Sequence, residues 1–545
     1  LFADIFPDSE IAKNYSAAKT KTTCKLNGAL KPYFLEETVK HLQKEPFSLS
    51  TDGSNNTGIQ KMNPITVKLF DVNHIYHQFL DIGITVGRHS ATAEVIFEGT
   101  DHCLQQYNVP WYNCVNFSLD NTSVNTGKHN SLMSRAKEKT KDIYICGCLC
   151  HIIHITASKA SAEFAQETGF DLDDYCIDVS YWFTKSTKRK AGLEYCQFCD
   201  QDYKTAIDHV STRWLSLEMA TNRILQLYRS LKSHFLSETG SQARFKHLRK
   251  AFLSPITEVY LMFFQHVFPL FTNLNKLLQR EEPLIYLVFQ EMQKFLKKIL
   301  GKFVTAEAIV QGGSDLSKVD YKNLDKQLND AHIFIGSITR AALTKGMKDG
   351  DIDEVSVNKF FDGVHAFYVK TCAYVMENLP LDDEVLHNAP CIDYTQRFDK
   401  VLPYSSPEEE EKLSDEFLDY QTMRVDGQKE EFYRMDIIWG YLTTMKESAL
   451  TSLPRFTHLG KVAKLILSLP HSNTDAEQVF CLVRQNKTAF RDSLSLEGTL
   501  SSLLTVKMAR PESEGSYYRF EPPDVITASK KVMWEYNEKH QEVRK

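Results

Sequence analysis

The protein has 545 residues and a mass of 62.6 kDa, which excludes a single small domain. Hydrophobic residues make up 42% and charged residues 25% of the chain, and these globular proportions exclude wholesale disorder. The formal net charge of -6 excludes a histone-like protein that binds nucleic acid through its overall charge. Any contact with nucleic acid must therefore come from local basic surfaces.

The cysteines and the longest apolar stretch indicate the cellular compartment in which the protein works. Of the 12 cysteines, Cys146, Cys148 and Cys150 lie within one apolar run, which favours a reduced interior over a disulfide framework. The longest apolar stretch, Val259 to Phe271, contains polar residues and is too short to span a bilayer. These features predict a cytosolic or nuclear protein without a membrane-spanning helix.

Residues 46–167 change from a strand-like to a helix-like period. In the first predicted strand, Phe47, Leu49 and Thr51 alternate with polar residues, and a turn-rich cluster follows. The predicted strands are 47–51, 65–72, 79–85, 112–119 and 143–150, and the predicted helices are 91–107, 122–139 and 151–166. Short connections between the first three strands predict an antiparallel meander. The pattern indicates an α/β fold.

Residues 168–455 are predicted to be mostly helical. The amphipathic stretches are 214–236, 244–253, 258–278, 284–298 and 316–343, and glycine or proline interrupts the pattern between them. The run of four glutamates after Pro407 is interpreted as an exposed linker. This part of the chain therefore forms a large helical block.

A helix is predicted to begin at Ser472, with Asp475 in its first turn, because this pairing suits an N-cap. Helical spacing brings one acid and three cations onto a single face: Glu477, Arg484, Lys487 and Arg491. Such a face can combine a metal ligand with a phosphate path. The alternative is a solvated face with ordinary ion pairs.

Two aspartates close two predicted strands. Asp52 follows the first strand and Asp120 follows the fourth. In a sheet whose first strand is central and pairs with the fourth, the two carboxylates lie side by side, and Glu477 can complete the set. Carboxylates are the hard ligands that Mg²⁺ prefers, and two ions about 4 Å apart can catalyse phosphoryl transfer. The alternative is that each aspartate is only a turn residue.

Five short patches follow one another along the chain: 50–53, 116–121, the pair Cys148 and His151, 212–214, and 472–480. In this order they resemble the hAT superfamily of cut-and-paste DNA transposases. The resemblance implies an RNase H-like mixed sheet interrupted by a large all-helical insertion. It divides the chain into a helical segment at 1–45, a first catalytic part at 46–167, an insertion at 168–455, and a last part with a dimerisation region at 456–545.

The resemblance also implies roles for individual residues. Asp52, Asp120 and Glu477 match the catalytic triad and would hold two Mg²⁺ or Mn²⁺ ions. Trp214 matches a tryptophan that stacks on a flipped base, with Arg213 beside it, and aromatic stacking on a base is worth about 1 to 3 kcal/mol. Without the resemblance, Trp214 would simply begin a buried amphipathic helix.

Two groups of cysteines and histidines suggest, as an alternative, that these residues bind zinc. Cys148 and Cys150 are predicted to lie on a strand, His151 and His154 begin the next helix, and a second group comprises Cys196, Cys199 and His209. A structural zinc site needs four converging ligands. Cys148 and His151 are therefore interpreted as support for the active site or as DNA contacts.

The chain departs from the family pattern at two places. Gln478 stands where the signature usually has an arginine after the third acid. Family members commonly carry an N-terminal BED-type zinc finger, and residues 1–45 resemble the segment that follows such a finger. We therefore expect that specific recognition of transposon ends is absent from this chain.

These inferences predict a nuclear transposase that acts on double-stranded DNA as a homo-oligomer, either a dimer or larger, and leaves a hairpin on flanking DNA. The basic stretches 185–190 and 294–302, with Arg484, Lys487 and Arg491, are candidate DNA contacts or solvated helix faces. The alternatives are a domesticated, non-enzymatic DNA-binding scaffold and an RNase H-like nuclease that acts on RNA or hybrids.

Overall fold

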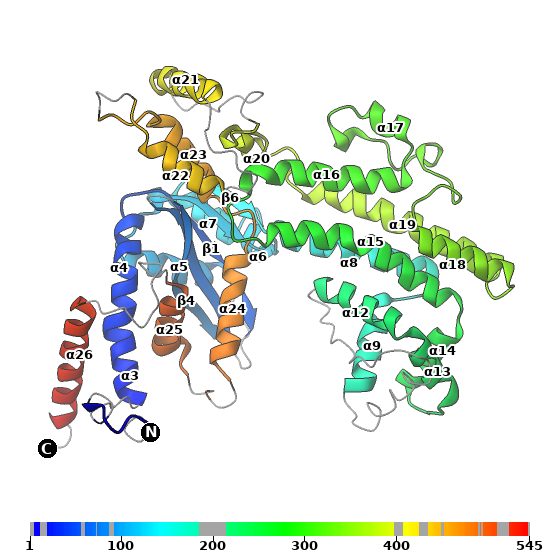
Figure 1. Cartoon of the computed structure of the whole chain (residues 1–545), viewed down its shortest axis with the longest axis horizontal. Helices are drawn as coiled ribbons and strands as arrows, with labels where there is room; N and C mark the ends of the chain where they lie inside the picture. The colour runs from blue at the N-terminus through cyan, green and yellow to red at the C-terminus, as the bar shows by residue number, and fades with distance from the viewer. Residues whose placement is uncertain are drawn as a thin grey trace. The chain divides into compact units, whose positions relative to one another are not determined.

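The computed structural model describes residues 5–10, 13, 19–55, 60–71, 74–86, 92–184, 214–396, 407–423, 434–447, 452–488, 491, 494–509 and 523–542. The fold is mixed α/β, and it divides into two compact units. The first unit comprises 1–148, 281–286 and 388–545, and the second comprises 149–280 and 287–387. Figure 1 shows the sheet of the first unit and the helices of the second.

The sheet of the first unit contains the strands β1 (Phe47–Thr51), β2 (Ser54–Asn55), β3 (Gln60–Phe70), β4 (Ile75–Val86), β5 (Cys114–Leu119) and β6 (Tyr144–Gly147). β3 pairs antiparallel with β1, β2 and β4, which confirms the predicted meander. β1 also pairs parallel with β5, and β5 pairs parallel with β6. The first strand is therefore central and adjoins the fourth predicted strand, which is the arrangement that would bring Asp52 and Asp120 together.

Helices cover both faces of the sheet. On one face, α4 (Lys31–Leu42), α5 (Ala93–Gln106) and α7 (Leu132–Lys139) share a core with the alternating apolar residues of β1 and β5. On the other face, α24 (Thr474–Asn486), the turn η9 (Leu496–Leu500) and α25 (Ser501–Met508) pack on Met62, Phe79 and Ile82. Helices from the C-terminal part of the chain thus cover one face of a sheet whose strands all lie within residues 47–147 (Figure 1).

The remaining elements of the first unit are all helical. They are α3 (Lys19–Lys25), η1 (Leu26–Leu30), η2 (Trp111–Asn113), α6 (Ser123–Thr126), η6 (Ala389–Ile392), α21 (Pro407–Thr422), α22 (Met435–Thr444), α23 (His458–Ser468) and α26 (Pro523–Glu542). The prediction of an exposed linker after Pro407 is wrong, because these residues begin α21. Proline suits the first position of a helix, and acids in the first turn complement the helix dipole.

Two boundaries near the strand edge differ from the prediction. The predicted helix 122–139 is two helices, because α6 ends before Gly127 and Ser131 begins α7 through a capping box with Ser134. The predicted strand 143–150 ends at Gly147, so placing Cys148 and Cys150 on it was wrong. Cys150 lies in the first turn of the next helix.

The second unit is formed by α8 (Leu149–Thr168), α9 (Leu172–Thr184), α12 (Trp214–Gln226), α13 (Tyr228–Ser237), α14 (Ala243–Leu253), α15 (Ile256–Leu278), α16 (Ile285–Phe303), α17 (Ala306–Gln311), η4 (Leu316–Lys318), η5 (Leu324–Lys326), α18 (Ser337–Lys348), α19 (Glu354–Asn378) and α20 (Glu384–Asn388). Phe164 of α8 lies at the centre of an aromatic core, in contact with Phe263 and Phe360. Because α8 packs along α19, it belongs to this unit.

The helix predicted over 316–343 is wrong. The Asp315 and Asn323 side chains accept hydrogen bonds from backbone N–H groups two residues later, at 3.1 and 3.0 Å, and only short turns form there. The continuous helix α18 starts after Gly336, whose φ of 92° is unsuited to a helix.

The described cysteines are free thiols, as their pattern predicted. Across the described ranges, no helix has both the length and the apolar character needed to cross a membrane.

Candidate active site

Parallel pairing brings the two aspartates to the same edge of the sheet. Ser50 of β1 lies opposite Ser118 of β5, and Asp52 and Asp120 each follow two residues later. Because parallel strands run in the same direction, their carboxyl ends meet at one edge. The adjacency predicted for Asp52 and Asp120 follows directly from this register.

Glu477 reaches this edge from the first turn of α24. The Asn473 side chain donates a hydrogen bond to the carbonyl of Thr51, the last residue of β1, at 2.9 Å. The backbone N–H of Glu477 in turn donates to the carbonyl of Asn473 at 3.2 Å. The beginning of α24 is thus attached to the strand end that carries Asp52.

The predicted N-cap at Ser472 is wrong by one residue. The helix begins at Thr474 with Asn473 at the N-cap, and the Asn473 side chain makes no capping hydrogen bond. The Ser472 hydroxyl lies 2.8 Å from that of Thr474. The Asn473 Nδ2 group donates to β1, which fixes the direction of the amide, and its Oδ1, the atom that would accept a capping bond, makes no hydrogen bond with any described residue.

The three acids interact electrostatically. Burial, followed by the nearby carboxylates of Asp120 and Glu477, raises the pKa of Asp52 to about 7. The N–H of Gly53 donates to Asp52 Oδ1 at 2.8 Å and offsets only part of this effect. Asp52 therefore holds its proton at the pH where an isolated aspartate is fully ionised.

Asp120 is oriented by the loop that follows it. Its Oδ1 accepts hydrogen bonds from the backbone N–H of Thr122 at 3.0 Å and from the Thr122 hydroxyl at 2.7 Å. The side-chain amide of Asn125 donates to the same oxygen. These donors fix the direction of the carboxylate.

The donor chemistry of this edge fits a hard divalent cation. Carboxylate oxygens are the preferred ligands of Mg²⁺ and Mn²⁺, and mutual repulsion among the three acids is what such an ion would relieve. In the described ranges, however, no three histidine, cysteine, aspartate or glutamate side chains are arranged to hold a metal ion as they stand. Binding would require the carboxylates to turn towards a common point.

Cys148 supports the edge through its backbone. Its N–H donates to the Leu119 carbonyl at 2.9 Å, and its own carbonyl accepts from the Asn121 side chain at 2.8 Å. The residue is buried and follows β6. The loop that carries Asp120 is therefore bound to the end of β6.

The other cysteine and histidine candidates lie elsewhere in the chain. His151 is in the first turn of α8, in the second unit, and its ring stacks on that of His154 with centroids 6.4 Å apart. Cys196, Cys199 and His209 lie outside the described residues.

The predicted DNA contacts are only partly described. Arg213 and the basic stretch 185–190 lie outside the described residues, and Trp214 is the first residue of α12, with its side chain also outside the description. On α24, Arg484 is exposed and Lys487 is the C-cap residue. The prediction that Arg491 shares their helical face is wrong, because α24 ends at Asn486.

The ending of α24 has a local cause. The Asn486 side chain donates to the Leu482 carbonyl and accepts a hydrogen bond from Lys507 of α25 at 2.8 Å. These bonds hold the last turn of the helix against its neighbour.

The sequence analysis did not single out Lys68, a buried lysine that interacts electrostatically with Asp475 and Asp436. Lys68 of β3 is 1% exposed, and burial lowers its pKa to about 8 although Asp475 and Asp436 oppose the shift. His77 Nδ1 lies 2.6 Å from Asp475 Oδ2. The sequence feature that could have indicated this buried lysine is its position within the mostly apolar strand segment 65–70.

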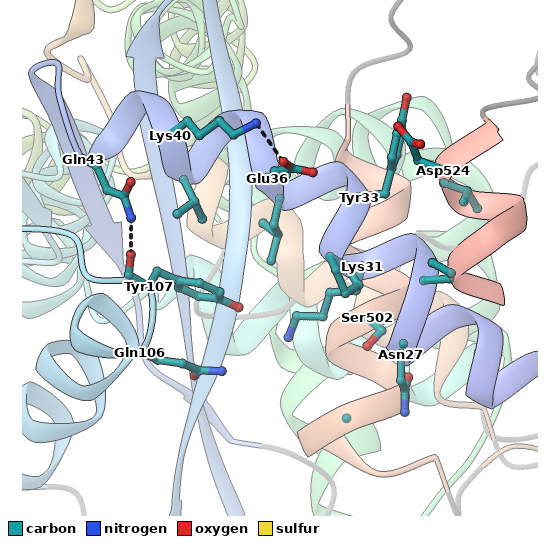
Figure 2. Close-up of a pocket in the computed structure, with 18 residues that line it drawn as sticks. Asn27, Lys31, Tyr33, Glu36, Lys40, Gln43, Gln106, Tyr107, Ser502 and Asp524 are labelled. Carbon is teal, nitrogen blue, oxygen red and sulfur yellow. Dashed lines mark hydrogen bonds and ion pairs between the residues drawn. The ribbon is translucent and has the colours of Figure 1, made fainter. Parts of the chain in front are cut away.

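A cavity of about 760 Å³ lies apart from the acids, along α4 (Figure 2). Its lining includes Lys31, Tyr33 and Glu36 of α4, Tyr107, and Asp524 of α26. Gln43 Nε2 donates to the Tyr107 carbonyl at 2.8 Å, which joins α4 to the end of α5. None of the three acids lines this cavity.

No known protein-family model matches the chain. The functional interpretation therefore depends on the acids at the edge of the sheet and on the resemblance of the motifs.

Proposed function

We propose that the protein is a hAT-type DNA transposase that cleaves transposon ends and joins them to target DNA by metal-dependent phosphoryl transfer. One observation carries the proposal: Asp52, Asp120 and Glu477 come from distant parts of the chain and interact closely enough to affect the pKa of Asp52. A carboxyl group whose pKa is raised by burial and by neighbouring carboxylates is a candidate for a functional site.

The arrangement of the sheet supports an RNase H-like core. Three antiparallel strands are followed by two that run parallel to the central strand β1. A compact helical unit is inserted between these strands and α24, which carries Glu477. Such an insertion ahead of the last acid is what the motif resemblance implies.

The residues have separable tasks in the proposed reaction. Two bound Mg²⁺ or Mn²⁺ ions would activate the attacking oxygen and stabilise the leaving oxygen. Asp52 must lose its proton to act as a ligand, Thr122 and Asn125 hold Asp120 in one orientation, and the first turn of α24 supplies Glu477. Water would first attack a phosphodiester of one strand and displace its 3' oxygen, and the freed 3' hydroxyl would then attack a phosphodiester of the opposite strand and displace a second 3' oxygen, which closes the hairpin.

DNA would be held by residues outside the acid cluster. The motif resemblance assigns Trp214 to stacking on a flipped base, with Arg213 beside it, and stacking of this kind can hold a distorted duplex for hairpin formation. Arg484, Lys487 and Arg491 are the proposed phosphate contacts. Replacing Trp214 by alanine is expected to reduce hairpin formation more than DNA binding.

The test is cleavage of duplex DNA that carries the terminal inverted repeats flanking the gene, with Mg²⁺ or Mn²⁺ present. D52N, D120N and E477Q should each reduce cleavage about 1000-fold, equivalent to about 4 kcal/mol, while DNA binding in a gel-shift assay persists. D142N removes an exposed acid and serves as the matched control. Cleavage that survives all three substitutions would disprove the assignment.

The alternative function is a transposase-derived DNA-binding scaffold without catalytic activity. Gln478 stands where the family signature usually has an arginine, which puts a phosphate or ion-pair contact beside Glu477 in doubt but leaves the three acids in place. Absence of inverted repeats and target duplications around the gene, together with DNA binding that needs no cation, would support this alternative.

A further inference from the structure

A row of polar residues crosses the face of the sheet that α24 covers. The strand register aligns them side by side on five strands: Tyr144, Asn116, Ser48, Lys68 and His77. Because side chains alternate along a strand, this row faces away from the apolar core that contains Phe47 and Leu49. Ser48 and Asn116 are both completely buried.

The segment that leads into α24 lies against this polar face. The Lys68 ammonium group donates to the Leu469 carbonyl at 3.1 Å, and the Cys146 thiol donates to the Pro470 carbonyl at 3.5 Å. The Asn473 amide holds the end of β1. Three strands therefore anchor one short segment just before the helix that carries Glu477.

Asp475 extends this anchoring into the first turn of α24. Its carboxylate lies 2.6 Å from His77 Nδ1, with only 16% of the Asp475 side chain exposed. In a helix, residues two positions apart point in nearly opposite directions, so holding Asp475 against β3 and β4 sets the direction of Glu477.

Packing alone does not require a charge at this position. A methionine has nearly the same length as lysine and would fill the space without the cost of burying an ammonium group. What the ammonium adds is a directional hydrogen bond to Leu469 and a charge beside Asp475. Both act on the segment that places Glu477.

We propose that Lys68 and His77 are positioning residues: by anchoring Leu469 and Asp475 to the sheet, they fix the rotation of α24 and so hold Glu477 beside Asp52 and Asp120. This inference depends on the proposed function, since Glu477 is a ligand only there. The anchoring itself can be measured without any reaction.

The experiment compares K68M with a matched control, K464M, and with the double variant K68M/D475N. Lys464 is a half-buried lysine on α23, 5.4 Å from the Phe70 ring centroid, so it tests the loss of a nearby cation. The measurements are amide hydrogen exchange over 475–479, Mn²⁺ affinity by calorimetry, and the midpoint of urea unfolding.

K68M should accelerate exchange over 475–479 and weaken Mn²⁺ affinity about 10- to 100-fold, the usual effect of removing a residue that orients a ligand. K464M should change neither. The double variant should not regain stability relative to K68M, because D475N also removes the carboxylate that His77 contacts. Its Mn²⁺ affinity should remain low.

Unchanged exchange in K68M would overturn the inference. So would recovery of Mn²⁺ affinity together with stability in the double variant, because Lys68 would then be merely structural. Failure of the wild-type protein to bind Mn²⁺ gives a different result: it overturns the proposed function, while the exchange data still report whether Lys68 anchors α24.

Discussion

The carboxyl group of Asp120 disfavours ionisation of Asp52, because two parallel strands end level with each other. Burial of Asp52 is the larger cause, and together with the carboxylates of Asp120 and Glu477 it raises the pKa of Asp52 to about 7. The register of β1 and β5 thus has a direct chemical consequence.

The first prediction concerns stability and pH. In the unfolded chain Asp52 ionises near its ordinary value of 3.8, whereas the folded protein keeps the proton up to about 7. Without metal, this group's stabilising contribution is therefore complete below pH 4 and lost as the pH rises through 7. The D52N variant cannot ionise at this position. Its free energy of unfolding, relative to that of the wild type, should therefore increase by about 1 to 3 kcal/mol between pH 5 and pH 8. Urea unfolding at both values measures it, and a constant difference would contradict it.

The second prediction concerns stabilisation by metal. Since a cation and a proton compete for Asp52, Mn²⁺ should raise the melting temperature more at pH 8 than at pH 6. At a concentration 100 times Kd, binding stabilises a fold by about 2.7 kcal/mol. E477Q should reduce the shift, and the D142N control should keep it. An equal shift in wild type and E477Q would place the ion elsewhere.

The third prediction concerns an ion pair at the start of α22 in which Asp436 is buried and the Arg434 side chain is 36% exposed. Asp436 is 0% exposed and accepts hydrogen bonds from the Ile75 N–H at 2.9 Å and from Arg434 at 3.1 and 2.7 Å. R434M leaves this carboxylate without its cation and should destabilise the first unit by about 3 kcal/mol. Amide exchange in β4 reports this loss.

The control for that substitution is an exposed ion pair. Lys294 and Glu291 lie 2.7 Å apart on α16, with 60% of the lysine side chain exposed. K294M should cost less than about 0.5 kcal/mol. Equal effects of R434M and K294M would show that burial of Asp436 does not matter.

The fourth prediction contrasts two glycines. A Cβ on Gly28 would meet Val532 Cγ2 at 2.7 Å, so G28A should loosen α26 from η1. Gly301 in α16 has no atom within 4 Å of the same position, and G301A should stabilise the helix by about 0.5 to 1 kcal/mol. Faster amide exchange over 523–542 in G28A, absent in G301A, is the expected result.

Sequence patterns located five of the strands and the two aspartates that follow β1 and β5, but they missed β2 and some strand ends. Alternation in β1 and turn residues after it predicted where Asp52 lies, and parallel pairing with β5 then determined its neighbour. Patterns failed where a side chain bonds to distant backbone. Asn473 holds Thr51 instead of capping its own helix, and this choice depends on a contact 422 positions away in the chain.

Lys68 illustrates the same limit. Within a strand its charge suggests an exposed edge, yet it is buried because Leu469 supplies an acceptor on that face. The helix prediction over 316–343 failed for a local reason. The Asp315 and Asn323 side chains compete for backbone N–H groups, and helical periodicity in the sequence does not show this competition.

The polar face of the sheet has a further consequence during synthesis. The strands leave the ribosome long before residues 469–486 exist, so the proposed nuclease cannot assemble on an unfinished chain. Until then, β1, β3 and β5 present Ser48, Lys68 and Asn116 on this face beside the apolar side chains of Met62, Phe79 and Ile82, which the C-terminal helices later cover. Since partly folded chains aggregate through exposed apolar surface, the polar row limits the apolar area that this face exposes.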